Sequence, residues 1–116
     1  MSTAITRAIS VRQPFAELIL RGKKTVEYRS RPTRIKERVY LYASKTKGDP
    51  VDFGRANIDL NKVRYGVIIG SVEIVGCEGT DGEYEWHLAK PERFAEPLTP
   101  TNHAQPGIWR PQFKTD

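Results

Sequence analysis

A lysine, a glutamate and an arginine lie close together in the sequence, at Lys24, Glu27 and Arg29. The carboxylate of Glu27 can accept hydrogen bonds from the edge of a nucleic-acid base, while Lys24 and Arg29 can bind a phosphate or a carbonyl oxygen. Arginine suits phosphate because its planar guanidinium donates hydrogen bonds in pairs. The alternative is an ion-pair network that only orders the fold. These three residues are therefore candidates for ligand binding.

The residues before this group predict a short helix. Phe15, Leu18 and Ile19 recur at helical spacing and form one apolar stripe. Pro14 is a residue that helices tolerate in their first turn, and Gly22 is typical of the position at which a helix ends. The expected helix has only about two turns, so packing against the rest of the protein must stabilise it.

A strand that ends at Arg29 is expected to follow the helix, because its residues favour extended structure. Alternate residues of a strand share a face, so Glu27 and Arg29 belong to one face and Val26 and Tyr28 to the other. We expect Val26 and Tyr28 to face the core, and Glu27 and Arg29 to face a cleft. Lys24 lies at the corner between helix and strand, from which it can reach that cleft.

Several other segments have the pattern of short strands. Residues 65–75 form a nearly continuous apolar run, as in a strand buried on both faces, and Gly70 within it predicts a bulge or a close backbone approach. Gly76, Gly79 and Gly82 predict turns. The remaining expected elements are strands over 8–12, 39–43, 84–88 and 107–110, a helical turn within 51–58, and an extended, proline-rich tail from residue 91. These elements predict an α+β, mostly β fold, a small barrel with one or two short helices.

Basic residues are concentrated in one stretch of the chain, whose overall net charge is +5. Residues 21–47 contain ten basic and two acidic residues and carry +8, which leaves −3 on the rest of the chain. A basic stretch on a nearly neutral body is the electrostatic pattern of a protein that binds a polyanion such as nucleic acid. A solvated basic loop is the alternative explanation.

Metal and disulfide chemistry have little support in the composition. Cys77 is the only cysteine, so no intrachain disulfide can form, and a reducing cytoplasm is the expected location. With one cysteine and two widely spaced histidines, His87 and His103, no usual zinc motif can be assembled. We therefore expect no metal and no cofactor. No apolar run approaches the roughly 18 residues of a membrane helix, so we expect no membrane partner. We also expect a monomer in solution.

Polar residues at two corners extend the candidate binding surface. Arg12 and Gln13 precede the expected helix, and Ser44 and Lys45 end the expected strand 39–43. Such corners often carry functional side chains, although solvated turns are the alternative. Aromatic side chains can stack on bases, which contributes roughly 1–3 kcal/mol per base. Trp109 is the aromatic residue that we favour for this role.

The sequence resembles the activating-signal-cointegrator-homology (ASCH) family. The family's opening motif is a glycine, a lysine two residues later, a glutamate three residues after that and an arginine two residues further on. Gly22, Lys24, Glu27 and Arg29 fill all four positions. The resemblance covers nearly the whole chain, through the blocks 9–29, 41–45, 66–73 and 107–110.

This resemblance implies a single ASCH domain over residues 1–116 with a PUA-like pseudo-β-barrel, the fold of pseudouridine synthases and archaeosine transglycosylases. It also implies a nucleic-acid surface in a cleft beside the first helix. The expected ligand is RNA, another single-stranded nucleic acid or a modified nucleoside. We interpret the protein first as a nucleic-acid-binding module, with the candidate residues Arg12, Gln13, Lys24, Glu27, Arg29, Ser44, Lys45 and Trp109.

An enzyme is the alternative that the resemblance leaves open. Some bacterial relatives hydrolyse N4-acetylcytidine with a lysine, a threonine and a glutamate; their lysine corresponds to Lys24, but their threonine falls at Glu27. A glutamate cannot replace a hydroxyl nucleophile, but it can activate water as a general base while Lys24 polarises the carbonyl. Glu83 or Glu85 would then supply a second carboxylate. A ribonuclease is also open, with Lys24 stabilising the phosphorane and Glu27 as base.

Overall fold

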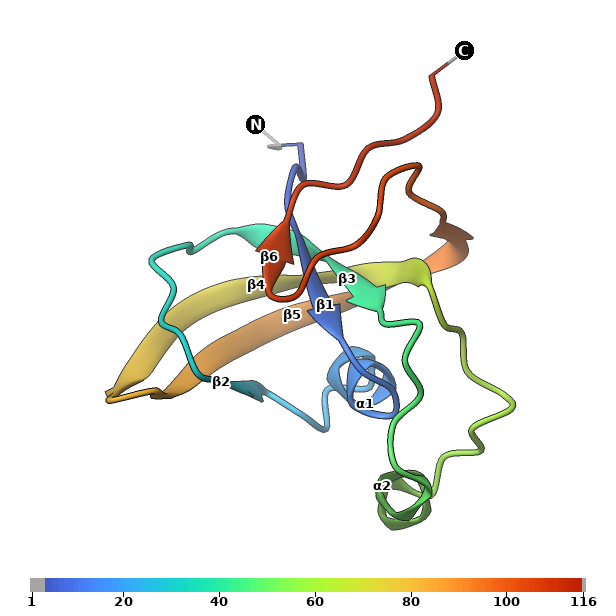
Figure 1. Cartoon of the computed structure of the whole chain (residues 1–116), viewed down its shortest axis with the longest axis horizontal. Helices are drawn as coiled ribbons and strands as arrows, with labels where there is room; N and C mark the ends of the chain where they lie inside the picture. The colour runs from blue at the N-terminus through green and yellow to red at the C-terminus, as the bar shows by residue number, and fades with distance from the viewer. Residues whose placement is uncertain (1–3, 116) are drawn as a thin grey trace.

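A curled, six-stranded sheet with two short helices makes up the protein, whose computed structural model describes residues 4–115 (Figure 1). This is the α+β, mostly β, barrel-like architecture that the sequence predicts. Residues 1–3 and 116, which the expected domain includes, lie outside the described residues. In chain order the elements are β1 (Ala8–Val11), α1 (Phe15–Leu20), β2 (Val26–Arg29), β3 (Arg38–Ala43), α2 (Pro50–Ala56), β4 (Val67–Thr80), β5 (Glu83–Leu98) and β6 (Ile108–Trp109).

The long antiparallel hairpin of β4 and β5 forms the centre of the sheet, whose strand order is β2-β5-β4-β3-β1-β6. β1 pairs in parallel with β3, whereas β6 pairs antiparallel with β1 and β2 antiparallel with β5. Because parallel strands run in the same direction, the carboxyl ends of β1 and β3 meet at one edge of the sheet. This edge brings together residues that are distant in the sequence.

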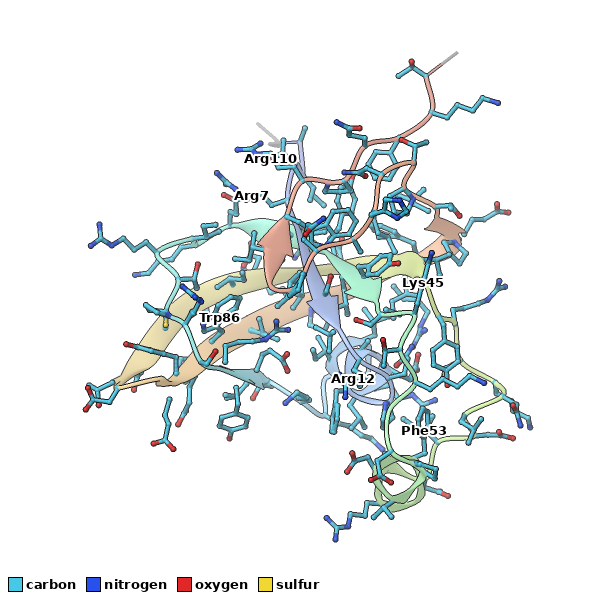
Figure 2. All side chains as sticks on the ribbon, in the orientation of Figure 1. Arg7, Arg12, Lys45, Phe53, Trp86 and Arg110 are labelled. Atoms are coloured by element: carbon cyan, nitrogen blue, oxygen red, sulfur yellow. The ribbon has the colours of Figure 1, made fainter. Side chains whose placement is uncertain are left out.

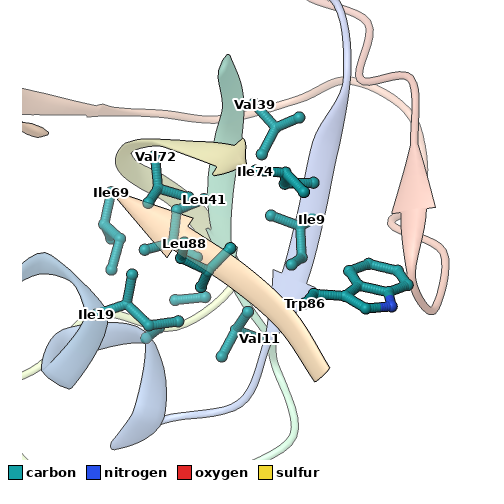
Figure 3. Close-up of a cluster of buried hydrophobic side chains, with 12 residues drawn as sticks. Ile9, Val11, Ile19, Val39, Leu41, Ile69, Val72, Ile74, Trp86 and Leu88 are labelled. Carbon is teal, nitrogen blue, oxygen red and sulfur yellow. The ribbon is translucent and has the colours of Figure 1, made fainter. Parts of the chain in front are cut away.

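The hydrophobic core lies between the curled sheet and α1. Ile9, Leu41 and Ile74 contribute side chains from three different strands, and Ile19 contributes one from α1 (Figure 3). Trp86 of β5 closes one end of this cluster, with its indole nitrogen donating a hydrogen bond of 2.9 Å to the carbonyl of Arg31. Of the apolar stripe predicted for the first helix, Ile19 is buried in this core and Phe15 packs against it, whereas Leu18 is half-buried and lies outside the cluster.

Hydrogen bonds from Arg93 attach α1 to β5. The buried carboxylate of Glu17 accepts a hydrogen bond of 2.7 Å from Arg21 Nε, one turn later, and one of 3.0 Å from Arg93 Nη1 of β5. Burial alone would raise the pKa of Glu17, but these hydrogen bonds and the two positive charges outweigh it and lower the pKa. Both helices are short: within residues 4–115 no helix has the length and apolar character needed to cross a membrane.

The central strands are longer than the sequence predicts. β4 continues through Gly76 and Gly79, which were expected to form turns, and only Asp81 and Gly82 turn the chain into β5. A Cβ atom at Gly79 would lie 2.1 Å from the carbonyl oxygen of Glu83. Glycine at this position therefore allows the two strands to approach closely, which explains why it lies within the hairpin rather than at its turn.

The extended tail also begins later than predicted. Pro91, where the tail was expected to start, lies inside β5. Ser71 is opposite Glu92 and Glu73 is opposite Ala89, so the register shifts between these pairs and the chain bulges at Pro91. A bulge is one of the few places at which a strand accommodates proline, because no ladder hydrogen bond is required there.

One of the two faces of β2 differs from the prediction. Tyr28 is 69 % exposed and Val26 only half-buried, although both were expected to face the core. The side chains of Glu27 and Arg29 are 12 % and 20 % exposed. β2 is an edge strand paired only with β5, and its Glu27–Arg29 face lies over Trp86, opposite Glu27 in the register. The alternation was therefore predicted correctly, but the placement of Val26 and Tyr28 in the core was wrong.

Candidate nucleic-acid interface

A pocket of about 520 Å³ lies where the carboxyl ends of β1 and β3 meet β2 and the segment before β6. Its size is that of a typical small-ligand site, for which roughly 300–1,000 Å³ is usual. Three walls surround it: the ends of the parallel strands, the inner face of β2, and residues 103–107. The lining residues are Ser10, Arg12, Glu27, Arg29, Tyr42, Ser44, Lys45, Thr46, His103, Ala104, Gln105, Pro106 and Gly107.

The first wall follows from the parallel pairing of β1 and β3. The backbone N–H of Ser44 donates a hydrogen bond of 2.9 Å to the carbonyl of Val11, so the chain segments after the two strands stay side by side. Arg12 and Lys45, labelled in Figure 2, are exposed at this edge. Tyr42 lies deeper, and its burial raises the pKa of its phenol. At this edge the neutral side chain of Tyr42 forms the floor of the pocket, and the basic side chains of Arg12 and Lys45 form its rim.

The second wall is formed by Glu27 and Arg29 of β2. Arg29 Nε donates a hydrogen bond of 2.9 Å to Glu27 Oε2, and Arg29 Nη2 donates to the same oxygen and, at 2.6 Å, to the carbonyl of Ser10. The guanidinium carbon also lies 5.4 Å from the centre of the Trp86 ring. Carboxylate, carbonyl and aromatic ring thus fix the guanidinium in one orientation, with both charged groups lining the pocket.

Lys24 contacts Glu27 from outside the pocket. Its Nζ is 3.5 Å from Glu27 Oε1, and it lies over two aromatic rings, 5.5 Å from the centre of Phe15 and 5.2 Å from that of Tyr28. Lys24 is not among the residues that line the pocket. Its charge acts on the pocket through Glu27, whose two oxygens face Lys24 and Arg29 respectively.

The third wall, residues 103–107, is attached to β1 through Ser10. Ser10 Oγ donates a hydrogen bond of 2.8 Å to the carbonyl of Gln105 and accepts one of 2.9 Å from Trp109 Nε1. The Ser10 N–H donates a hydrogen bond of 3.1 Å to the carbonyl of Gly107. Since the Ser10 carbonyl also binds Arg29, this one residue connects the second wall to the third.

The structure brings five of the eight candidate residues into the pocket lining: Arg12, Glu27, Arg29, Ser44 and Lys45. Gln13 is fully buried instead. Its side-chain oxygen accepts a hydrogen bond of 2.9 Å from the N–H of Glu17, and its nitrogen donates one of 3.1 Å to the carbonyl of Arg64. Trp109 is only 6 % exposed, because its ring packs at a right angle on Tyr42. Trp109 therefore packs behind the pocket lining, and Gln13 holds α1 to the segment at Arg64.

Sequence reasoning missed the contribution of residues 103–107. His103 and Gln105 line the pocket and are exposed, yet they lie in a stretch with no periodic pattern. The only signal was the prediction of a closing strand at 107–110, which places the residues before it next to its partner strand. Thr46, which extends the corner of Ser44 and Lys45, was also missed.

The charges of the pocket favour an anionic ligand with hydrogen-bond donors. Arg12, Arg29 and Lys45 provide three positive charges against the single carboxylate of Glu27. The hydroxyl of Ser44 adds a neutral donor and acceptor, whereas the polar groups of Ser10 are already hydrogen-bonded within the protein. A cation is less suited to this site, and residues 4–115 contain no group of three or more His, Cys, Asp or Glu side chains that could hold a metal ion.

Comparisons with known proteins agree with this architecture. The family model described as "ASCH domain" matches residues 9–101. A solved structure of a tyrosine-to-phenylalanine variant of ZmASCH from Zymomonas mobilis has a similar fold, with a TM-score of 0.50, 21 % identity and coverage of 90 % of this chain and 88 % of that chain. A search of curated proteins gave no significant match. Because the family model covers most of the sequence, this chain belongs to the ASCH domain family, with a PUA-like fold.

Proposed function

We propose that this ASCH domain binds single-stranded nucleic acid, with RNA as the favoured ligand, by inserting one nucleotide into the pocket. The observation that carries this proposal is the fixed Glu27–Arg29 pair inside a pocket whose rim is basic. In this arrangement the rim side chains, Arg12 and Lys45, bind phosphate oxygens. The carboxylate of Glu27 accepts hydrogen bonds from the base edge, as carboxylates do from the amino group of cytosine.

The pocket also suits a modified base. Its volume of about 520 Å³ lies well within the range of small-ligand sites, and the exposed side chains of His103 and Gln105 line one wall. These two side chains are not held by the ion pairs that fix Glu27 and Arg29, so they can adapt to a substituent on the base. We infer that the third wall determines which modification is accepted.

Binding is favoured over N4-acetylcytidine hydrolysis by the position of Lys24. In such a hydrolysis, the general base and the group that polarises the carbonyl must both lie next to the substrate's carbonyl group. Glu27 lines the pocket but Lys24 does not, because its ammonium group lies over Phe15 and Tyr28. Glu83 and Glu85, the candidates for a second carboxylate, also lie outside this pocket.

Ribonuclease action by a pair of histidines is disfavoured by the same geometry. His103 lines the pocket, whereas His87 lies on β5, 3.6 Å from Glu78 and away from the lining. Acid–base cleavage of RNA needs a general base and a general acid that both lie beside the reacting oxygens of the substrate. The histidines of this chain are not arranged in that way.

The test is a titration of the purified protein with a fluorescent single-stranded RNA at low salt, followed by anisotropy. Arg12→Ala and Lys45→Ala are expected to weaken binding, each by roughly 3- to 30-fold if one charge-assisted contact is lost. Arg29→Lys retains the charge but loses the fork that binds Glu27 and Ser10, and it is expected to weaken binding as well.

Matched controls separate the pocket from general charge. Arg55→Ala in α2 and Lys62→Ala in the following loop remove the same charges from exposed positions outside the lining. Equal losses in pocket and control variants would show that the pocket is not the binding site. Mass spectrometry after incubation with N4-acetylcytidine and with RNA completes the test, since turnover of either substrate would show that the protein is an enzyme and overturn a function limited to binding.

A further inference from the structure

A second hollow lies beside the pocket and shares Arg29 with it. It measures about 440 Å³ and is lined by Tyr28 and Arg29 at the end of β2 and by Gly82, Glu83, Tyr84 and Glu85 at the hairpin. The hairpin tip and the end of β2 are close in space: a Cβ atom on Gly82 would lie 4.0 Å from the carbonyl oxygen of Ser30. In Figure 1 both lie at the left of the molecule.

Tyr28 gives this hollow an aromatic surface. It is the most exposed large hydrophobic side chain in the described part of the chain, at 69 %. Lys24 Nζ lies 5.2 Å from its ring centre, and Glu85 is its partner across the β2–β5 pairing. Tyr84, opposite Arg29, adds a second ring to the lining. An exposed ring of this kind offers a stacking surface for a flat, partly apolar ligand.

We propose that this second hollow is a subsite for a neighbouring nucleotide of the strand, whose base stacks on Tyr28. The proposal rests on the proposed function of the first pocket and specifies its ligand: an oligonucleotide rather than a free nucleoside. Arg29 carries the argument, because a basic residue that lines both hollows lies where the phosphate between two adjacent nucleotides would pass.

The charges around the hollow fit a base rather than a phosphate. Glu83 and Glu85 are exposed and would repel a phosphate placed between them, but they can accept hydrogen bonds from exocyclic amino groups. Basic residues return directly beyond Ser30, where Arg31 and Arg34 are exposed. A strand that passes from Arg29 over Tyr28 therefore stays close to positive charge, because Lys24 Nζ also lies 5.2 Å from the Tyr28 ring centre.

The test compares a mononucleotide with an oligonucleotide, using 5′-CMP and single-stranded RNA octanucleotides of cytidine and of adenosine. Wild type is expected to bind the octanucleotides more tightly than 5′-CMP. Tyr28→Ala is expected to weaken octanucleotide binding by roughly 5- to 100-fold, the size of one lost stacking contact. The affinity for 5′-CMP should stay within about twofold of wild type, because Tyr28 does not line the first pocket.

Two further variants are controls for the role of the Tyr28 ring. Tyr28→Phe retains the ring and should bind octanucleotides as wild type does, while Val75→Ala removes an exposed apolar side chain outside both hollows and should have no effect. Because Tyr28 is largely exposed, its variants should fold, and thermal unfolding tests this independently.

The possible failures are distinguishable. If wild type binds octanucleotides and Tyr28→Ala binds them equally well, the second subsite is overturned while the proposed function stands. If Tyr28→Ala weakens 5′-CMP and octanucleotide binding by the same factor, the two-subsite arrangement is also overturned. If wild type binds neither ligand, the proposed function and the subsite fall together.

Discussion

Ser10 contacts two walls of the pocket at once, through all its polar atoms. Its hydroxyl binds Gln105 and Trp109, its N–H binds Gly107, and its carbonyl binds Arg29. The position of the segment 103–107 therefore depends on a residue that sequence reasoning treated only as part of a strand.

Ser10→Ala is expected to lower the free energy of unfolding by about 1–3 kcal/mol, because the buried indole N–H of Trp109 loses its acceptor. Urea unfolding followed by tryptophan fluorescence measures this loss. RNA affinity should also fall, since residues 103–107 lose the hydroxyl that holds Gln105. The exposed Ser30→Ala is the matched control, and equal effects in the two variants would contradict the assigned role of Ser10.

At the scale of elements, the close contact of β4 with β5 and α1 depends on Gly70. A Cβ atom there would lie 2.2 Å from the carbonyl oxygen of Glu92 and 2.8 Å from the Leu20 side chain. Gly70→Ala is therefore expected to destabilise the protein by about 1–3 kcal/mol, the usual effect of overpacking, or more where the backbone must move. Thermal unfolding measures it.

Gly76→Ala is the matched control on the same strand. Its Cβ atom would meet only the His87 ring, at 4.0 Å, which is an ordinary contact distance. This variant should unfold within about 0.5 kcal/mol of wild type, as surface substitutions usually do. A loss in Gly76→Ala as large as in Gly70→Ala would mean that general strand propensity, rather than the close approach, explains the glycine.

The attachment of α1 to β5 predicts a dependence of stability on pH. The pKa of Glu17 is lowered in the folded protein, mainly by hydrogen bonds from Arg93 and Arg21 that outweigh its burial, from an ordinary value of 4.5. The unfolded chain therefore binds the proton more readily as the pH falls below that value. The stabilisation from Glu17 is complete above pH 4.5 and is lost as the pH falls through the lower pKa of the folded state.

Glu17→Gln removes this titration. Its free energy of unfolding should be lower than that of wild type at pH 7, with a difference that shrinks as the pH falls from 4.5 through the lower pKa of Glu17 in the folded protein. Urea unfolding at a series of pH values gives both curves. Glu78→Gln, at an exposed carboxylate on β4, is the control. Parallel curves for wild type and Glu17→Gln would contradict the assignment.

Local patterns were sufficient to predict most of the elements but not their environment. The stripe of Phe15, Leu18 and Ile19 predicted α1 because helical spacing is a property of neighbouring residues. The outward face of Tyr28 was not predictable in this way, because the covering of a face depends on strands that come later in the chain. The same reason explains the buried position of Trp109, and it applies to residues 103–107, which reach the pocket only through the pairing of β6 with β1.

At the scale of the whole molecule, the charge is unevenly distributed along the chain. Residues 21–47 carry a net charge of +8, and the rest of the chain carries −3, which gives the overall +5. This stretch supplies β2, the exposed Arg31 and Arg34, and the rim residue Lys45, so the sequence asymmetry becomes a basic region at the first pocket and beside the end of β2. A long-range attraction of this kind increases the rate of encounter with an anionic ligand and weakens as salt screens it.

The affinity for single-stranded RNA is therefore expected to fall steeply with salt. Each phosphate neutralised on a single strand contributes about −0.7 to the slope of log K against log salt. Contacts from Arg12, Arg29 and Lys45 predict a slope of about −2, and engagement of Arg31 and Arg34 by a longer strand predicts about −3.5. Anisotropy titrations between 50 and 300 mM salt, a range of about six-fold, measure the slope with an octanucleotide. Lys45→Ala should reduce its magnitude by about 0.7, whereas Lys62→Ala should leave it unchanged. A slope near zero would mean that binding does not depend on phosphate contacts, and the basic rim would then have another purpose than holding a nucleic-acid strand.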